Sequence, residues 1–309
     1  MNKKTGFYIL TALVTGMLLL SACSSTSGAG STKGSSGSQT PAQVLQKTQD
    51  AMKQLKSVHL DLKSNSTVQT GTPTPSSSSS SASKGITTTL MGNGDENMPD
   101  QVSLHLTTQL GTTGQNLALS EVLLKDKVYI QNLKGKWYVI DKSKLTGGTN
   151  SLGTGNDAST VNKLLNIAQN AKLTDDGTVM LNGQKLRRLT VTFGKDALVQ
   201  LLNASGQSNS ALPQQSKDQL IKSVKEFNGT VDFWIDENTS YVHQVEEKLM
   251  MKLDTSALAA TPSSTGTSAA PGSVTSNTDT IIDLSKFNQP VTIKAPANAI
   301  PTDNLLSIF

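Results

Sequence analysis

Apolar and polar positions alternate along most of the chain with two periods, one typical of helices and the other of strands. Thr40 and Pro41 suit the N-cap and first position of a helix, and apolar residues then recur at helical spacing to about Lys56. From Val58 to Lys63 apolar and polar residues alternate one by one. The pattern therefore predicts an amphipathic helix over 41–56 that leads directly into a half-buried strand.

Similar runs follow at short intervals. Strand-like runs cover 86–90, 102–110, 117–124, 128–133, 137–140, 178–181, 185–193, 230–236, 241–253, 280–284 and 291–294. Helical patterns cover 158–173, 196–204 and 213–227. The dipeptide Asn182-Gly183 between two apolar runs predicts a tight hairpin. The absence of sustained strand–helix–strand alternation favours an α+β fold with an antiparallel sheet of about ten strands and a few helices on one side.

Polar, low-complexity inserts interrupt this pattern near 71–83 and 255–278, with a weaker one at 146–156. The first contains an unbroken serine run from Ser76 to Ser81. Both flanks of each insert have strand patterns, so we interpret the inserts as long disordered hairpin loops within one domain over 40–309. Interdomain linkers are the alternative.

The first 22 residues have the order of a secretory signal peptide. Lys3 and Lys4 precede an apolar run over 7–20, and small residues lead to Cys23, the single cysteine of the chain. The ending Leu20-Ser21-Ala22-Cys23 resembles the lipobox of bacterial lipoproteins, in which the cysteine carries the lipid. A signal-anchor helix is the alternative. The Ser- and Gly-rich stretch over 23–39 predicts a flexible tether.

Charge and cysteine content exclude several classes of function. The formal net charge is +4, and it falls to +2 without the two lysines of the signal peptide. No basic patch interleaved with aromatic residues is present, so we expect no nucleic-acid partner. With Cys23 assigned to lipid attachment, no thiol is left for a disulfide, a metal or a nucleophile.

Four stretches resemble the LppX/LprA/LprF/LprG lipoproteins, whose fold is shared with the periplasmic lipoprotein carrier LolA. They are the helix and strand over 42–61, the strands and turn over 121–141 with Gly135-Lys136-Trp137-Tyr138, the run over 229–245 with Phe233-Trp234-Ile235-Asp236, and the ending over 290–296. The resemblance implies a strongly curved antiparallel sheet, a half-open β-barrel, with helices on its concave face. It also implies an apolar cavity that holds the acyl chains of a lipid or a lipidated molecule.

Eleven apolar strand positions are candidates for lipid contact, although each would suit a packed core equally well. They are Leu104, Leu106, Val122, Leu124, Leu189, Val191, Val231, Phe233, Ile235, Leu249 and Met251.

No catalytic, metal or cofactor site is predicted. His59, His105 and His243 lie far apart in the sequence on strand patterns, which is more typical of surface residues than of ligands. No Gly-x-Ser-x-Gly elbow occurs on a strand–helix turn. Solvated strand faces and turns account for the carboxylates, which include Asp95, Glu96, Asp175, Asp176, Glu246 and Glu247.

The favoured hypothesis is therefore a non-enzymatic lipoprotein that binds or transfers lipids or lipidated molecules. It would be a monomer, anchored by lipid to the extracytoplasmic face of the cell membrane, with a lipid or an acylated glycolipid or lipoprotein as its partner. The alternatives are an envelope sensor or scaffold on the same fold and, less favoured, a hydrolase with an unrecognised site.

We expect Cys23→Ser to abolish membrane attachment and to leave the fold intact, because Cys23 is the only residue that could carry the lipid and it lies outside the folded domain. Immunoblotting of membrane and soluble cell fractions measures this. A Cys23→Ser chain that still fractionates with membranes would contradict the lipid anchor.

Overall fold

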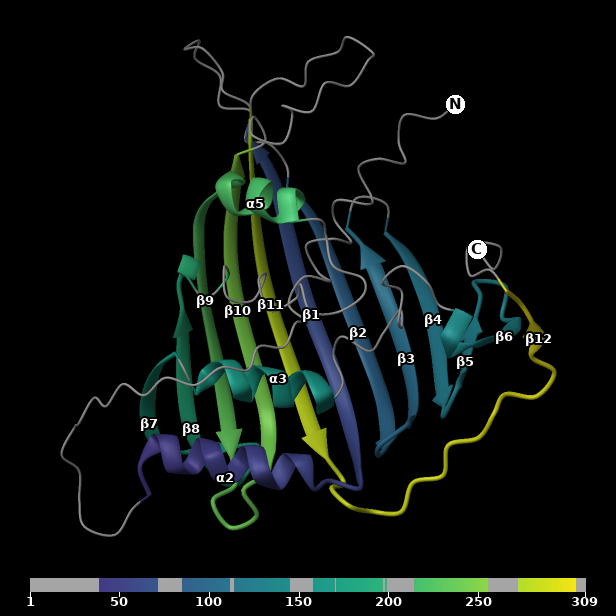
Figure 1. The fold of residues 1–309 in the computed structure, drawn as a ribbon, viewed down its shortest axis with the longest axis horizontal. Helices are drawn as coiled ribbons and strands as arrows, with labels where there is room; N and C mark the ends of the chain where they lie inside the picture. Colours follow the sequence, from purple (N-terminus) through teal and green to yellow (C-terminus); the bar gives the residue numbers. More distant parts are fainter. Residues whose placement is uncertain are drawn as a thin grey trace.

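A single antiparallel sheet with two open edges organises the molecule (Figure 1). The computed structural model describes residues 39–71, 85–111, 114–144, 158–169, 171–196, 198, 214–254 and 272–303. In order across the sheet, the strands are β12-β6-β5-β4-β3-β2-β1-β11-β10-β9-β8-β7, and every neighbouring pair is antiparallel except β12 and β6. The edge strands β12 and β7 do not pair with each other, so the curved sheet stays half-open, and the predicted fold class is confirmed.

The strands are long near the middle of the sheet and short toward the β12 edge. Their bounds are β1 Ser57–Gly71, β2 Ile86–Asn97, β3 Gln101–Leu110, β4 Gln115–Leu124, β5 Lys127–Gln131, β6 Trp137–Asp141, β7 Lys172–Leu181, β8 Gln184–Phe193, β9 Val224–Ile235, β10 Val242–Asp254, β11 Ser273–Ser285 and β12 Ile300–Pro301. The helices are α2 Pro41–Lys53, α3 Ala158–Ala168 and α5 Gln214–Ser223, with a 3-10 turn at Lys142–Lys144. No described helix has both the length and the apolar composition needed to cross a membrane.

Helix α2 begins where the sequence predicts, at a capping box. The Thr40 hydroxyl accepts a hydrogen bond from the Gln43 amide at 3.3 Å, and the Gln43 side chain accepts one from the Thr40 amide at 2.9 Å. The helix ends at Lys53 rather than Lys56, because the chain must turn into β1 at Ser57. The predicted helices over 158–173 and 213–227 also end early, at Ala168 and Ser223, because the residues that follow form β7 and β9. The predicted helix over 196–204 lies mostly outside the described residues.

The three helices lie on the same side of the sheet (Figure 1). Helices α2 and α3 cross one end of β7–β11, and α5 lies over the other end. Buried side chains of α2 and α3, among them Leu45, Met52 and Leu165, join inward-facing residues of the sheet in one large core. A smaller cluster of Leu123, Val128, Ile130 and Ile140 fills the inner face of β4–β6.

Two predictions about the last third of the chain are wrong. The insert near 255–278 is shorter than expected, because β11 begins at Ser273 and pairs with both β1 and β10. No strand forms over 291–294. Since both sides of β11 are occupied, the chain after it has to run to the far edge of the sheet, where it pairs with β6 at Ile300–Pro301 (yellow in Figure 1). The other inserts, over 72–83 and 146–156, lie outside the described residues.

Gly94 marks a close approach between β2 and β3. A Cβ atom on Gly94 would lie 2.4 Å from the carbonyl oxygen of Ser103 and 3.0 Å from Leu104 Cδ1. Gly94 is paired with Leu60 and Leu104, so its missing side chain leaves room for two buried leucines on the inner face. Glycine is therefore required here by the close approach of the backbone.

We expect Gly94→Ala to lower the free energy of unfolding by about 1–3 kcal/mol, because the new methyl group overpacks against backbone. Gly194→Ala is the control, since a Cβ there would meet nothing within 4 Å. Urea unfolding of the two variants measures the difference. Equal stability of the two variants would contradict the requirement for glycine at position 94.

Candidate functional site

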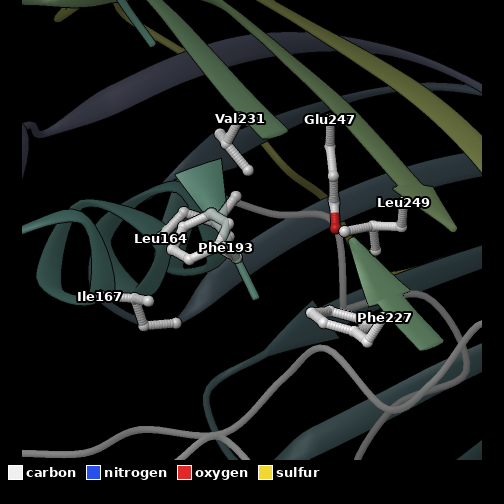
Figure 2. A pocket seen from close by; sticks show the side chains of 7 residues that line it. All are labelled: Leu164, Ile167, Phe193, Phe227, Val231, Glu247 and Leu249. Carbon is white, nitrogen blue, oxygen red and sulfur yellow. The ribbon is translucent and has the colours of Figure 1, made fainter. Parts of the chain in front are cut away.

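An apolar pocket lies between α3 and strands β8, β9 and β10 (Figure 2). It contains about 300 Å³ of empty space, part of it open to solvent. This volume includes open solvent, so the enclosed space is smaller than the volumes of about 300–1,000 Å³ that are typical of small-molecule sites. Its lining consists of Leu164 and Ile167 from α3, Phe193 from β8, Phe227 and Val231 from β9, and Glu247 and Leu249 from β10.

A glycine on β9 lies between two of the lining residues. Gly229 is paired with Phe193 on one side and with Leu249 on the other. A Cβ at Gly229 would lie 2.7 Å from Leu249 Cδ2 and 3.6 Å from Phe193 Cβ. The side chain of Leu249 therefore occupies the place that a side chain at Gly229 would take.

Helix α3 covers the pocket and is held against α2. Its residues Val161, Leu165 and Ala168 are fully buried, whereas Ile167 is half-buried at the pocket. Just beyond its end, the Gln169 side chain donates hydrogen bonds to Gln49 Oε1 at 2.7 Å and to Gln46 Oε1 at 3.1 Å. These contacts link the end of α3 to α2.

Glu247 is the one polar residue among the described residues of the lining. Its side chain points between Leu249 and Val231 (Figure 2), and the residue is 8% exposed. Its Oε1 atom is buried without a hydrogen-bond partner. Burial disfavours the charged form and raises the pKa of Glu247 from 4.5 to about 7.

Hydroxyl groups continue from Glu247 across the inner face of β11 and β1. Thr280, the cross-strand partner of Glu247, lies 2.8 Å from Ser64 through their hydroxyl oxygens. One pair further along, Thr278 donates to the Ser66 hydroxyl at 3.2 Å. A polar strip thus borders the apolar pocket on one side.

The sequence places the chain in a family. A profile of the family of unknown function DUF6612 matches residues 40–303. The chain belongs to DUF6612. A search of curated proteins finds no match for this DUF6612 protein.

Some solved structures have a similar layout. LprF from Mycobacterium bovis is 15% identical, over 85% of this chain and 100% of that chain, with a TM-score of 0.40. LppX from Mycobacterium tuberculosis is 18% identical, over 82% of this chain and 97% of that chain, with a TM-score of 0.37. A putative outer membrane lipoprotein-sorting protein domain from Vibrio parahaemolyticus is 10% identical, over 81% of this chain and 93% of that chain, with a TM-score of 0.25. LprF and LppX are among the lipoproteins that the sequence resembles, but likenesses this distant carry no inference about a ligand.

Most of the predicted lipid-contact residues lie on the inner face of the DUF6612 sheet. Val231 and Leu249 line the pocket, and Met251 packs nearby against the core. The others on this face are buried core residues: Leu104, Leu106, Leu189, Val191, Phe233 and Ile235.

The prediction that Val122 and Leu124 lie on the same face as the other candidates for lipid contact is wrong. The register pairs Leu104 with Glu121 and Val102 with Leu123, so Val122 and Leu124 face the opposite side of the sheet. The charged Glu121 made its own side of β4 look like the solvent face, yet this residue is buried. The expectation of solvated carboxylates is also wrong for Glu96 and Glu247, which are 3% and 8% exposed.

Sequence reasoning did not assign five lining residues to a site: Leu164, Ile167, Phe193, Phe227 and Glu247. A signal for Glu247 was available, since it shares a period-two face with Val245, Leu249 and Met251. An acid in the middle of an apolar strand face is typical of a buried, functional position.

The described histidines do not form a catalytic or metal site with the pocket. His105 Nδ1 lies 2.9 Å from the Ser120 hydroxyl, but this pair is on the outer face of the sheet. His59 lies 2.7 Å from Asp95, also on that face. Within the described ranges, no three His, Cys, Asp or Glu side chains are grouped to hold a metal ion.

We expect Glu247→Gln to stabilise the protein in a pH-dependent way. Between pH 4.5 and about 7 the unfolded chain loses the Glu247 proton while the folded one keeps it, so this group lowers stability as the pH rises. The variant should gain up to roughly 3 kcal/mol over the wild type, with the gain growing from pH 4.5 and levelling off above pH 7.

Urea unfolding at a series of pH values measures this difference. Glu246→Gln is the matched control, because Glu246 lies on the outer face of the same strand and forms an ion pair with Lys248 at 2.6 Å. A constant difference between wild type and Glu247→Gln across the range would contradict the raised pKa.

Proposed function

We propose that this DUF6612 protein binds the hydrocarbon chain of a lipid or a lipidated molecule in the pocket under α3, and that it does so without catalysing a reaction. The observation that carries the proposal is the lining itself, in which six of the seven residues are apolar. Such a surface offers a guest mainly the removal of apolar area from water, which favours hydrocarbon over polar metabolites.

The architecture supports this function. The sheet remains open between β7 and β12, so a guest could enter without passing through a closed wall. Ile167 and Leu249, which line the pocket, are only half-buried, and additional apolar surface on them would become buried on binding. The hydrophobic gain of such burial is about 25 cal/mol per Å².

The proposal includes an anchored location at the extracytoplasmic face of the cell membrane. Cys23 would carry the lipid, and the residues between it and Gln39 would act as the tether. At Gln39 the chain is fixed to the domain, because Arg187 donates a hydrogen bond to its carbonyl oxygen at 2.8 Å. Arg187 is held in turn by Asp175 at 2.6 Å and Glu237 at 2.9 Å.

Native mass spectrometry with lipid extraction tests the binding. The sample is the mature chain from residue 23 with Cys23→Ser, purified without detergent, so that no attached acyl chain competes for the pocket. We expect a stoichiometric lipid that is released on denaturation. Ile167→Trp should fill the pocket and reduce the bound fraction at least several-fold, whereas Met180→Trp, at a position 67% exposed on β7, should leave it unchanged.

A clean mass with no uptake of added lipids would overturn lipid binding. It would favour the alternative role, a non-catalytic envelope sensor or scaffold.

A further inference from the structure

Glu247 is a buried acid whose surroundings leave part of it unsatisfied. More than nine-tenths of the residue is buried, and its Oε1 atom has no hydrogen-bond partner. The carboxyl group points into the pocket beside Leu249 (Figure 2). An unpaired buried polar group is costly, and a carboxylate is especially so, which suggests that a guest supplies the missing partner.

Among the described residues, the side chains that line the pocket offer no positive charge to this acid. Its lining neighbours are all apolar. Lys248, the next residue, lies on the outer face and is paired with Glu246 at 2.6 Å. The partner of Glu247 on β9 is Val231, and its partner on β11 is Thr280.

The hydroxyl strip adds further hydrogen-bond acceptors beside Glu247, on the neighbouring strand β11. Cross-strand partners have Cβ atoms about 4.5–5.5 Å apart, so Thr280 and Glu247 can contact one small group together. The Thr280 hydroxyl is 2.8 Å from that of Ser64, and a hydroxyl oxygen that takes part in one hydrogen bond still has capacity to accept another.

We infer that the pocket selects an amphiphile with a hydrocarbon chain and a primary amine headgroup, whose ammonium donates hydrogen bonds to Glu247 and Thr280. This inference rests on the proposed lipid-binding function and specifies its guest. An ammonium has three donors and no acceptor, which matches a carboxylate beside hydroxyl oxygens. Its hydrogen bond to the carboxylate is charge-assisted, whereas a carboxylate or phosphate headgroup would place like charges together.

Three probes with one chain length separate the headgroup from the chain: dodecylamine, dodecanol and dodecanoate. Their affinities for the mature chain with Cys23→Ser are measured at pH 8 by isothermal titration calorimetry, below the micelle concentrations. We expect dodecylamine to bind about 10- to 100-fold more tightly than the other two, as a hydrogen bond to a charged group implies. Glu247→Gln should remove most of this preference, whereas Glu246→Gln should change none of the three affinities.

The outcomes distinguish the two levels of the proposal. If all three probes bind alike, or if Glu247→Gln leaves the amine preference intact, the pocket binds chains but the amine inference is wrong. If none of the probes binds to a wild-type chain that unfolds cooperatively, lipid binding and the amine inference both fail. If Thr280→Val retains the amine preference, the inferred hydrogen bond to Thr280 is wrong and the one to Glu247 is unaffected.

Discussion

The pairing of β1 with β11 is the constraint on which the rest of this structure depends. It runs from His59 opposite Ser285 to Gly71 opposite Ser273, and every pair in it joins residues more than 200 positions apart in sequence. β2–β6 extend the sheet from β1, and β10–β7 extend it from β11. Because side chains alternate between faces, this one register fixes which residues of both halves face the helices.

The same register places polar groups inside an otherwise apolar layer. Thr280 stands between Ser64 and Glu247 on the inner face, while the next pair toward α2 consists of Leu62 and Ile282. The end of the sheet covered by α2 is thus a packed core, and the pocket under α3 lies further along the strands, beside Glu247 and the hydroxyl strip. The buried acid Glu247 lowers the free energy of unfolding near neutral pH, and locally unfavourable groups of this kind are typical of functional sites.

Local patterns predicted much of the fold because they depend on neighbours in the sequence. The capping residues of α2, the Asn182-Gly183 hairpin and the alternation along β1 and β3 are examples. Prediction failed on β4, where Leu123 and Leu124 are both apolar and alternation alone does not identify the inner face. It also failed for residues 291–294, because β1 and β10 already occupy both sides of β11 and leave no place beside it for a following strand.

The sequence alone indicates the two-period pattern, the mostly antiparallel α+β class and a single cysteine after an apolar run, and it contains no recognisable catalytic motif. The order of the strands, the burial of Glu247 and the pocket under α3 depend on the tertiary structure. The physical reason is that burial and cavities arise from contacts between residues far apart in the chain. Their register is set by long-range strand pairing, which no local pattern encodes.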